Sequence, residues 1–113
     1  MSNLKKSEIK IVVDTNENNV PQKITWNAED GEIVDADAKA MFLALWDAKE
    51  QNAMRIDLWN HEMSVEEMRQ FFHQTLVTLA DSYERATGDK KITEDLRDYC
   101  YHFAEKMGLL PMS

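Results

Sequence analysis

Two short runs near the middle of the chain, AMFLALW at residues 40–46 and AMRIDLW at residues 53–59, constrain the fold more than any other feature. The first run is apolar at every position, whereas the second alternates between apolar and charged side chains. Two short apolar runs, one of which alternates with charged residues, predict β-strands. The polar residues AKEQ between them predict a hairpin with a four-residue loop. The segment is therefore expected to form two paired strands, one of them apolar on both sides.

The register of this hairpin follows from pairing Asp47 with Asn52 across the loop. One face of the paired strands then collects six apolar side chains, those of Met41, Leu43, Leu45, Met54, Ile56 and Leu58. The reverse face collects three large aromatic side chains and one possible ion pair, namely Phe42, Trp46, Arg55, Asp57 and Trp59.

The strands and helices along the rest of the chain predict an α+β fold. SEIKIVVD and VPQKITWN predict a first hairpin that pairs Ile11 with Ile24 and Ile9 with Trp26. Residues 28–38 are expected to form a loop between the hairpins, and residues 1–7 a flexible segment. The expected architecture is an antiparallel sheet of two β-hairpins, about four strands, followed by two C-terminal helices packed on one face.

Both expected helices have recognisable ends. Ser64 and Glu67 form a capping-box pattern, so the first helix should run from Val65 to about Thr87 and end at Gly88. The second should be capped by Thr93 and stop at Gly108 and Pro111.

Composition limits the class of protein. A chain of 113 residues with 43% apolar residues and three glycines predicts one globular domain over residues 1–113. The net charge of −8 disfavours nucleic acid as a partner, and no apolar stretch is long enough for membrane insertion. Cys100 is the only cysteine and cannot form an internal disulfide, which indicates a reducing compartment. We therefore expect a cytoplasmic protein.

The residue types that carry catalysis do not occur in catalytic spacings. His61 stands in HEMSV, which lacks the second histidine of a zinc-protease helix at the required spacing. His73 borders an apolar helix stripe, and Cys100 lies on another, where a thiol acts as a small hydrophobic group. With no glycine-rich phosphate motif either, we expect no enzyme, no cofactor and no metal site.

The aromatic reverse face of residues 40–59 is the stronger functional signal. Burying each large aromatic side chain contributes on the order of 2 kcal/mol, so the face should be covered. Residues 28–38 and the chain ends could cover it internally. Alternatively, the face could bind another protein, either a second copy of this chain in a homo-oligomer or a client, since aromatic residues beside an arginine are typical of interface centres. Both readings follow from the sequence.

Three segments together resemble the gliding-motility-associated GldC family. They are KKSEIKIVVDTNENNVPQKITWNAEDG, RIDLWNHEMSVEEMRQFFHQTLVTLADSYERAT and RDYCYHFAEKMGLL, and the likeness spans residues 5–110. IDLW followed by MRQFFHQTL is its specific part. The resemblance implies an accessory protein that supports gliding and the associated secretion machinery through protein contacts. It brings no catalytic residues with it.

Two other functions remain open at this stage. The order of two hairpins and two helices is similar to that of the SecB-type export chaperones, although only in layout. A SecB-like chaperone would hold exported clients on its apolar sheet. A small-ligand binding protein would instead use a pocket between sheet and helices, with His73, Tyr83 and Tyr99 as its polar lining.

Overall fold

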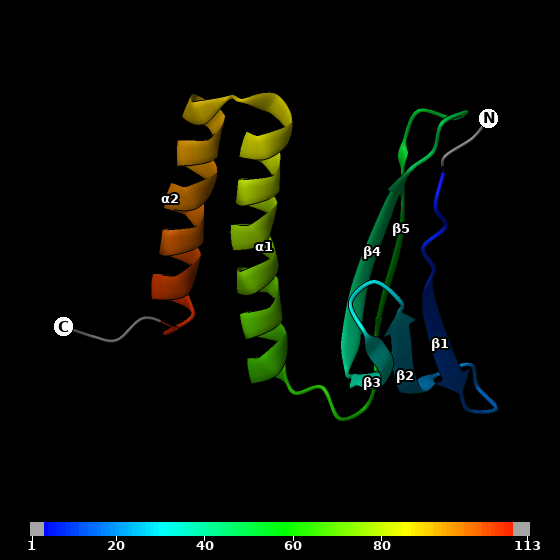
Figure 1. Ribbon diagram of the computed structural model, residues 1–113. Coiled ribbons are helices and arrows are strands. Elements are labelled where there is room, and N and C mark those ends of the chain that lie inside the picture. Colours follow the sequence, from blue (N-terminus) through cyan, green and yellow to red (C-terminus); the bar gives the residue numbers. More distant parts are fainter. Residues whose placement is uncertain (1–3, 110–113) are drawn as a thin grey trace. The chain divides into compact units, whose positions relative to one another are not determined.

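A computed structural model describes residues 4–109 and shows an α+β fold (Figure 1). Its elements are β1 (Ile9–Thr15), β2 (Pro21–Ala28), β3 (Ile33–Ala38), β4 (Ala40–Trp46), β5 (Ala53–Trp59), α1 (Val65–Thr87) and α2 (Lys90–Lys106). The strands form a three-stranded antiparallel sheet, in the order β1-β2-β3, and a two-stranded sheet of β4 and β5. The expected fold class is confirmed, but with five strands in two sheets where the sequence predicted about four.

The contacts of the chain group into two compact units, the strands up to Met63 and the helices from Ser64 onward. Each unit is described by itself below. The prediction that the helices pack on one face of the sheet, within a single domain, stays a prediction. Of the segment expected to be flexible, residues 1–3 lie outside the described residues, and residues 4–7 belong to neither a helix nor a strand.

The first hairpin forms in a register two residues away from the predicted one. Ile11 pairs with Trp26, and Val13 pairs with Ile24. A tight turn explains the difference: the Asn16 side chain accepts hydrogen bonds from the amides of Asn18 and Val20 at 2.9 and 3.0 Å. Pairing therefore continues to Thr15 and leaves a shorter loop. A shift of two residues keeps every side chain on its predicted face.

The expectation of a loop over residues 28–38 is wrong. β2 extends to Ala28, and β3 occupies Ile33–Ala38 as the third strand of the first sheet. The ladder passes an irregularity near Asn27, whose side-chain carbonyl accepts from the amide of Asp35 at 2.9 Å. Asp35 takes a left-handed backbone conformation there, with φ of 48°. This side-chain bond substitutes for a ladder bond, which a period-two pattern does not reveal.

The second hairpin has the predicted register at every position. Leu43 pairs with Ile56 in the middle, and the ladder runs without irregularity from Ala40 opposite Trp59 to Trp46 opposite Ala53. Lys39 is the single residue between β3 and β4, so the chain passes from one sheet to the other there. The amide of Asn60 donates to the carbonyl of Lys39 at 2.8 Å and ties the end of β5 to this corner.

α1 begins and ends where the sequence predicts. Ser64 accepts from the amide of Glu67 at 3.0 Å, and the Glu67 carboxylate accepts from the amide of Ser64 at 3.2 Å. Gly88 ends the helix in the left-handed region and donates its amide to the Glu84 carbonyl at 2.8 Å.

α2 begins earlier than predicted, because Asp89 and not Thr93 is its N-cap. The Asp89 carboxylate accepts from the amide of Ile92 at 3.1 Å, directly after the Gly88 turn. Thr93 lies inside the helix, where its hydroxyl donates to the Asp89 carbonyl at 2.7 Å. At the other end Gly108 adopts φ of 68°, as expected of a helix stop, while Pro111 lies outside the described residues.

Small side chains form the centre of the helical unit. Its buried residues are Ala80, Thr93, Cys100 and Ala104. His73 stacks on Phe103 with 5.9 Å between ring centroids. At the surface the Arg97 guanidinium bridges Asp81 and Glu84 of α1 at 2.9 and 3.2 Å. The helices thus pack through small residues and are joined at the rim by ion pairs.

Candidate protein interface on the second hairpin

The even-numbered positions of β4 and the odd-numbered positions of β5 form one face of the second hairpin, which we call the aromatic face. It consists of Ala40, Phe42, Ala44 and Trp46 from β4 and of Ala53, Arg55, Asp57 and Trp59 from β5. The ladder places Trp46 opposite Ala53 and Trp59 opposite Ala40. All five candidate interface residues predicted from the sequence lie on this face.

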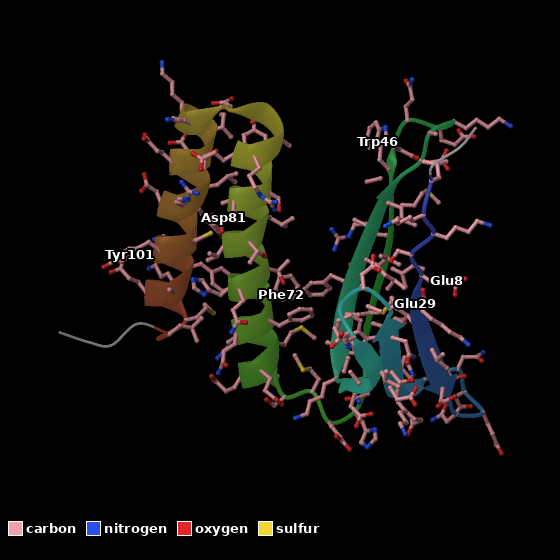
Figure 2. The ribbon with its side chains drawn as sticks, in the orientation of Figure 1. Glu8, Glu29, Trp46, Phe72, Asp81 and Tyr101 are labelled. Atoms are coloured by element: carbon pink, nitrogen blue, oxygen red, sulfur yellow. The ribbon has the colours of Figure 1, made fainter. Side chains whose placement is uncertain are left out.

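Both tryptophans of the aromatic face are solvent-exposed. Trp46 is 71% exposed and Trp59 is 55% exposed, while Phe42 is half-buried. Figure 2 shows Trp46 at the end of the hairpin that carries the turn between the strands. Residues 28–38, which could have covered the face, instead contribute β3 to the other sheet. The large exposure of both indole rings favours the interface reading over internal cover.

An ion pair lies between the two tryptophans. The guanidinium of Arg55 donates to the Asp57 carboxylate at 2.9 Å through Nη2 and at 3.4 Å through Nε. Their side chains are 52% and 37% exposed. An exposed ion pair contributes little to stability, so the pair is better suited to orienting a partner than to holding the hairpin together.

The opposite face of the hairpin is entirely apolar, as its register predicted. Its six residues include Leu45, Met54 and Ile56, which are 61%, 55% and 51% exposed. We call it the aliphatic face. A two-stranded hairpin is only marginally stable alone in water, so a hairpin with two such faces needs further packing.

The other sequence candidates lie elsewhere. His61 is exposed after β5. Cys100 is 6% exposed, and burial raises the pKa of its thiol. Within residues 4–109 no three His, Cys, Asp or Glu side chains gather as they would around a metal ion.

The proposed lining of a small-ligand pocket has other contacts in the helical unit. His73 stacks on Phe103, and the Tyr83 hydroxyl donates to the Asp89 carboxylate at 3.3 Å. Tyr99 is 57% exposed. A ligand site between sheet and helices stays a prediction.

Sequence reasoning missed a polar hollow in the strand unit. Its volume is about 480 Å³, and its lining comes from β2, β3, the Lys39 corner and the segment after β5: Gln22, Lys23, Ile24, Asp37, Ala38, Lys39, Asn60 and Glu62. A smaller hollow of about 270 Å³ involves Glu8 and Glu29, both labelled in Figure 2. The first hollow carries two lysines and two carboxylates, so its charges favour no single class of ligand. The one available signal was Asn60, a polar residue directly after an apolar strand.

Comparison with known proteins identifies the family. Neither helix of the described chain is long and apolar enough to cross a membrane. No curated protein and no solved structure matches the chain. The family model "Gliding motility-associated protein GldC-like" matches residues 21–109, which confirms the resemblance found in the sequence. The chain therefore belongs to the GldC-like family of gliding-motility-associated proteins.

Proposed function

We propose that this chain is a non-catalytic accessory protein of gliding motility and its associated secretion machinery, and that it binds a protein partner through the aromatic face. Family membership supplies the association with gliding motility. The role as an adaptor and the location in the cytoplasm are parts of the proposal. A lone, buried cysteine fits a reducing compartment.

The exposure of Trp46 and Trp59 carries this proposal. Each indole stands more than half in water, and covering it would contribute on the order of 2 kcal/mol to binding. Tryptophan and arginine are also the residue types that most often dominate binding energy at protein interfaces. The aromatic face supplies both tryptophans with Arg55 between them.

The spacing of these residues suggests the shape of the partner. Trp46 and Trp59 occupy the first and last pairs of the seven-pair ladder, so about 20 Å of sheet separates them. The Arg55–Asp57 pair lies between them. A matching surface would present two apolar pockets about 20 Å apart, with polar groups at its centre.

The test is quantitative capture of partners from a gliding cell, with the purified chain as bait. We expect Trp46→Ala and Trp59→Ala each to reduce recovery of the same partner at least tenfold. The matched control is Tyr101→Ala, which removes an aromatic side chain that is 62% exposed on α2, outside the face (Figure 2). Equal recovery by wild type and both tryptophan variants would show that the face binds no partner.

A chaperone for unfolded clients is the second candidate, and one observation favours it. Leu45, Met54 and Ile56 expose an aliphatic surface on the other side of the same hairpin, which suits an extended apolar peptide. Client binding through this surface would be insensitive to Trp46→Ala, so the same set of variants separates the two functions.

A further inference from the structure

The outer edge of β4 lacks the features that keep strand edges from pairing. No strand of the described residues pairs with β4 other than β5. Exposed edges normally carry charges, bulges or proline. β1 contains Lys10 and an irregularity after Asp14, β3 contains Asp35 at positive φ, and β5 contains Arg55. β4 has seven uncharged residues in an unbroken register, with no glycine or proline.

The hydrogen bonds at the two ends of the hairpin show which backbone groups face this edge. The amide of Asp47 donates to Asn52 at 2.9 Å, and the carbonyl of Lys39 accepts from Asn60 at 2.8 Å. In an antiparallel ladder, alternate residues direct both backbone groups to the same neighbour. The odd-numbered residues of β4 therefore bond to β5. The even-numbered residues, Ala40, Phe42, Ala44 and Trp46, direct theirs to the outer edge.

We infer that β4 pairs with β4 of a second copy of this chain, antiparallel and with Leu43 on the two-fold axis. This register is the one that pairs all seven residues of the strand. Ala40 then lies opposite Trp46 of the second copy, and Phe42 lies opposite its Ala44. Each large aromatic residue meets a small one. The four outward-facing residues of each copy thus form four pairs, and each pair exchanges two hydrogen bonds. The junction therefore contains about eight hydrogen bonds, all of them between backbone groups.

The same register continues both faces of the hairpin across the junction. Leu43 lies opposite its own copy, and Met41 lies opposite Leu45, so the aliphatic face becomes continuous over four strands. The aromatic faces of the two copies lie on the same side of the joined sheet, because pairing keeps the alternation in phase. Pairing itself is independent of the proposed function. Its consequence, one double-sized binding face, rests on that function.

A cysteine on the axis tests the register directly. Leu43 and its copy form a non-hydrogen-bonded pair with Cα atoms about 4.5 Å apart, which a disulfide can span. In a Cys100→Ala background, Leu43→Cys should give a covalent dimer on mild oxidation. The matched control is Leu45→Cys on the same face of the same strand. Its copy lies about 13 Å away along the paired strands, too far for a disulfide.

A proline on the outer edge tests the pairing without a new bond. The amide of Ala44 faces outward, so Ala44→Pro removes a hydrogen bond to the second copy and none to β5. Light scattering should show a dimer for the wild type and a monomer for Ala44→Pro, with unchanged circular dichroism. A monomeric wild type at tens of micromolar, a dimeric Ala44→Pro variant, or equal cross-linking of the two cysteine variants would overturn the inference. Partner capture is measured separately on the Trp46→Ala and Trp59→Ala variants, so failure of the pairing and failure of the proposed function are distinguishable.

Discussion

Gly88 allows a stability prediction in which only backbone conformational terms act. Gly88 ends α1 with φ of 70° and ψ of 7°, and its amide caps the carbonyl of Glu84. A Cβ added at this position would meet no other atom within 4 Å. Gly88→Ala therefore creates no clash and deletes no contact. Its effect in the folded state is the conformational preference of an L-residue, which disfavours the left-handed region.

The magnitude follows from two opposing terms. Left-handed backbone costs a non-glycine residue roughly 1–2 kcal/mol. Replacing glycine also reduces the entropy of the unfolded chain, which offsets about 0.4–1 kcal/mol. We expect Gly88→Ala to lower the free energy of unfolding by about 1 kcal/mol. With a urea dependence of about 1–2 kcal/mol per molar, the unfolding midpoint should fall by about 0.5–1 M.

Gly31→Ala is the matched control. Gly31 is not at positive φ, and a Cβ there would meet Ile33 Cδ1 at 3.5 Å, an ordinary van der Waals distance. The midpoint should stay the same or rise slightly, because only the unfolded-chain term acts. Urea unfolding followed by far-ultraviolet circular dichroism measures both variants. Equal midpoints for the two variants would refute the assignment of Gly88 as a helix cap that requires the left-handed region.

Two further predictions concern buried groups. The Asn60 side chain is 7% exposed and accepts a hydrogen bond from the amide of Glu62 at 3.0 Å. Asn60→Ala should therefore lower the free energy of unfolding by about 1 kcal/mol and lower the melting temperature. Asn60→Asp keeps the acceptor and should lower both by less. Burial raises the pKa of the Cys100 thiol, so above its ordinary pKa the unfolded chain loses this proton first. The stability contributed by the neutral thiol is complete at neutral pH and is lost as pH rises through the alkaline range. Urea midpoints measured at about pH 7 and about pH 10 should show this loss in the wild type, and Cys100→Ala should remove it.

The parts of the fold that the sequence predicted well are those where one local signal is sufficient. The capping box at Ser64 and the glycine at position 88 define both ends of α1. The register of β4 and β5 was predictable because both strands are seven residues long and the loop between them is short. A wrong register would have placed charged residues among the six apolar side chains of the aliphatic face. In this hairpin the hydrophobic pattern and the loop length predicted the same register.

The errors arose where a polar side chain replaces a backbone partner. Asn16 tightens the first turn, Asn27 carries the ladder past an irregularity to β3, and Asp89 caps α2. Asn16 accepts two hydrogen bonds from backbone amides, and Asn27 and Asp89 accept one each, and none of these bonds is set by periodicity. Hydrophobic patterning does not detect such bonds. It therefore predicted a loop at residues 28–38 and a late start for α2.

The candidate site was predictable as a set of residues but not as an exposed surface. Alternation placed Phe42, Trp46, Arg55, Asp57 and Trp59 on one face, and the ladder confirms this. Whether residues 28–38 cover these side chains depends on the structure of that segment, which the hydrophobic pattern did not predict. β3 takes that segment into the other sheet. Exposure of the tryptophans is thus a result of the tertiary structure.

The difference between β4 and β5 follows from where each strand would lie in the inferred dimer. A strand that is apolar on both sides is typical of a sheet interior, whereas alternation with charged residues is typical of a strand with one wet face. Within residues 4–109 of one chain both strands are edges, a position that does not suit the doubly apolar AMFLALW. In the order β5-β4-β4-β5, the two copies of β4 become the central strands. β5, with Arg55 and Asp57, becomes the edge, where charged side chains discourage further pairing. The assembly would therefore stop at two copies, which light scattering distinguishes from an open series of larger species.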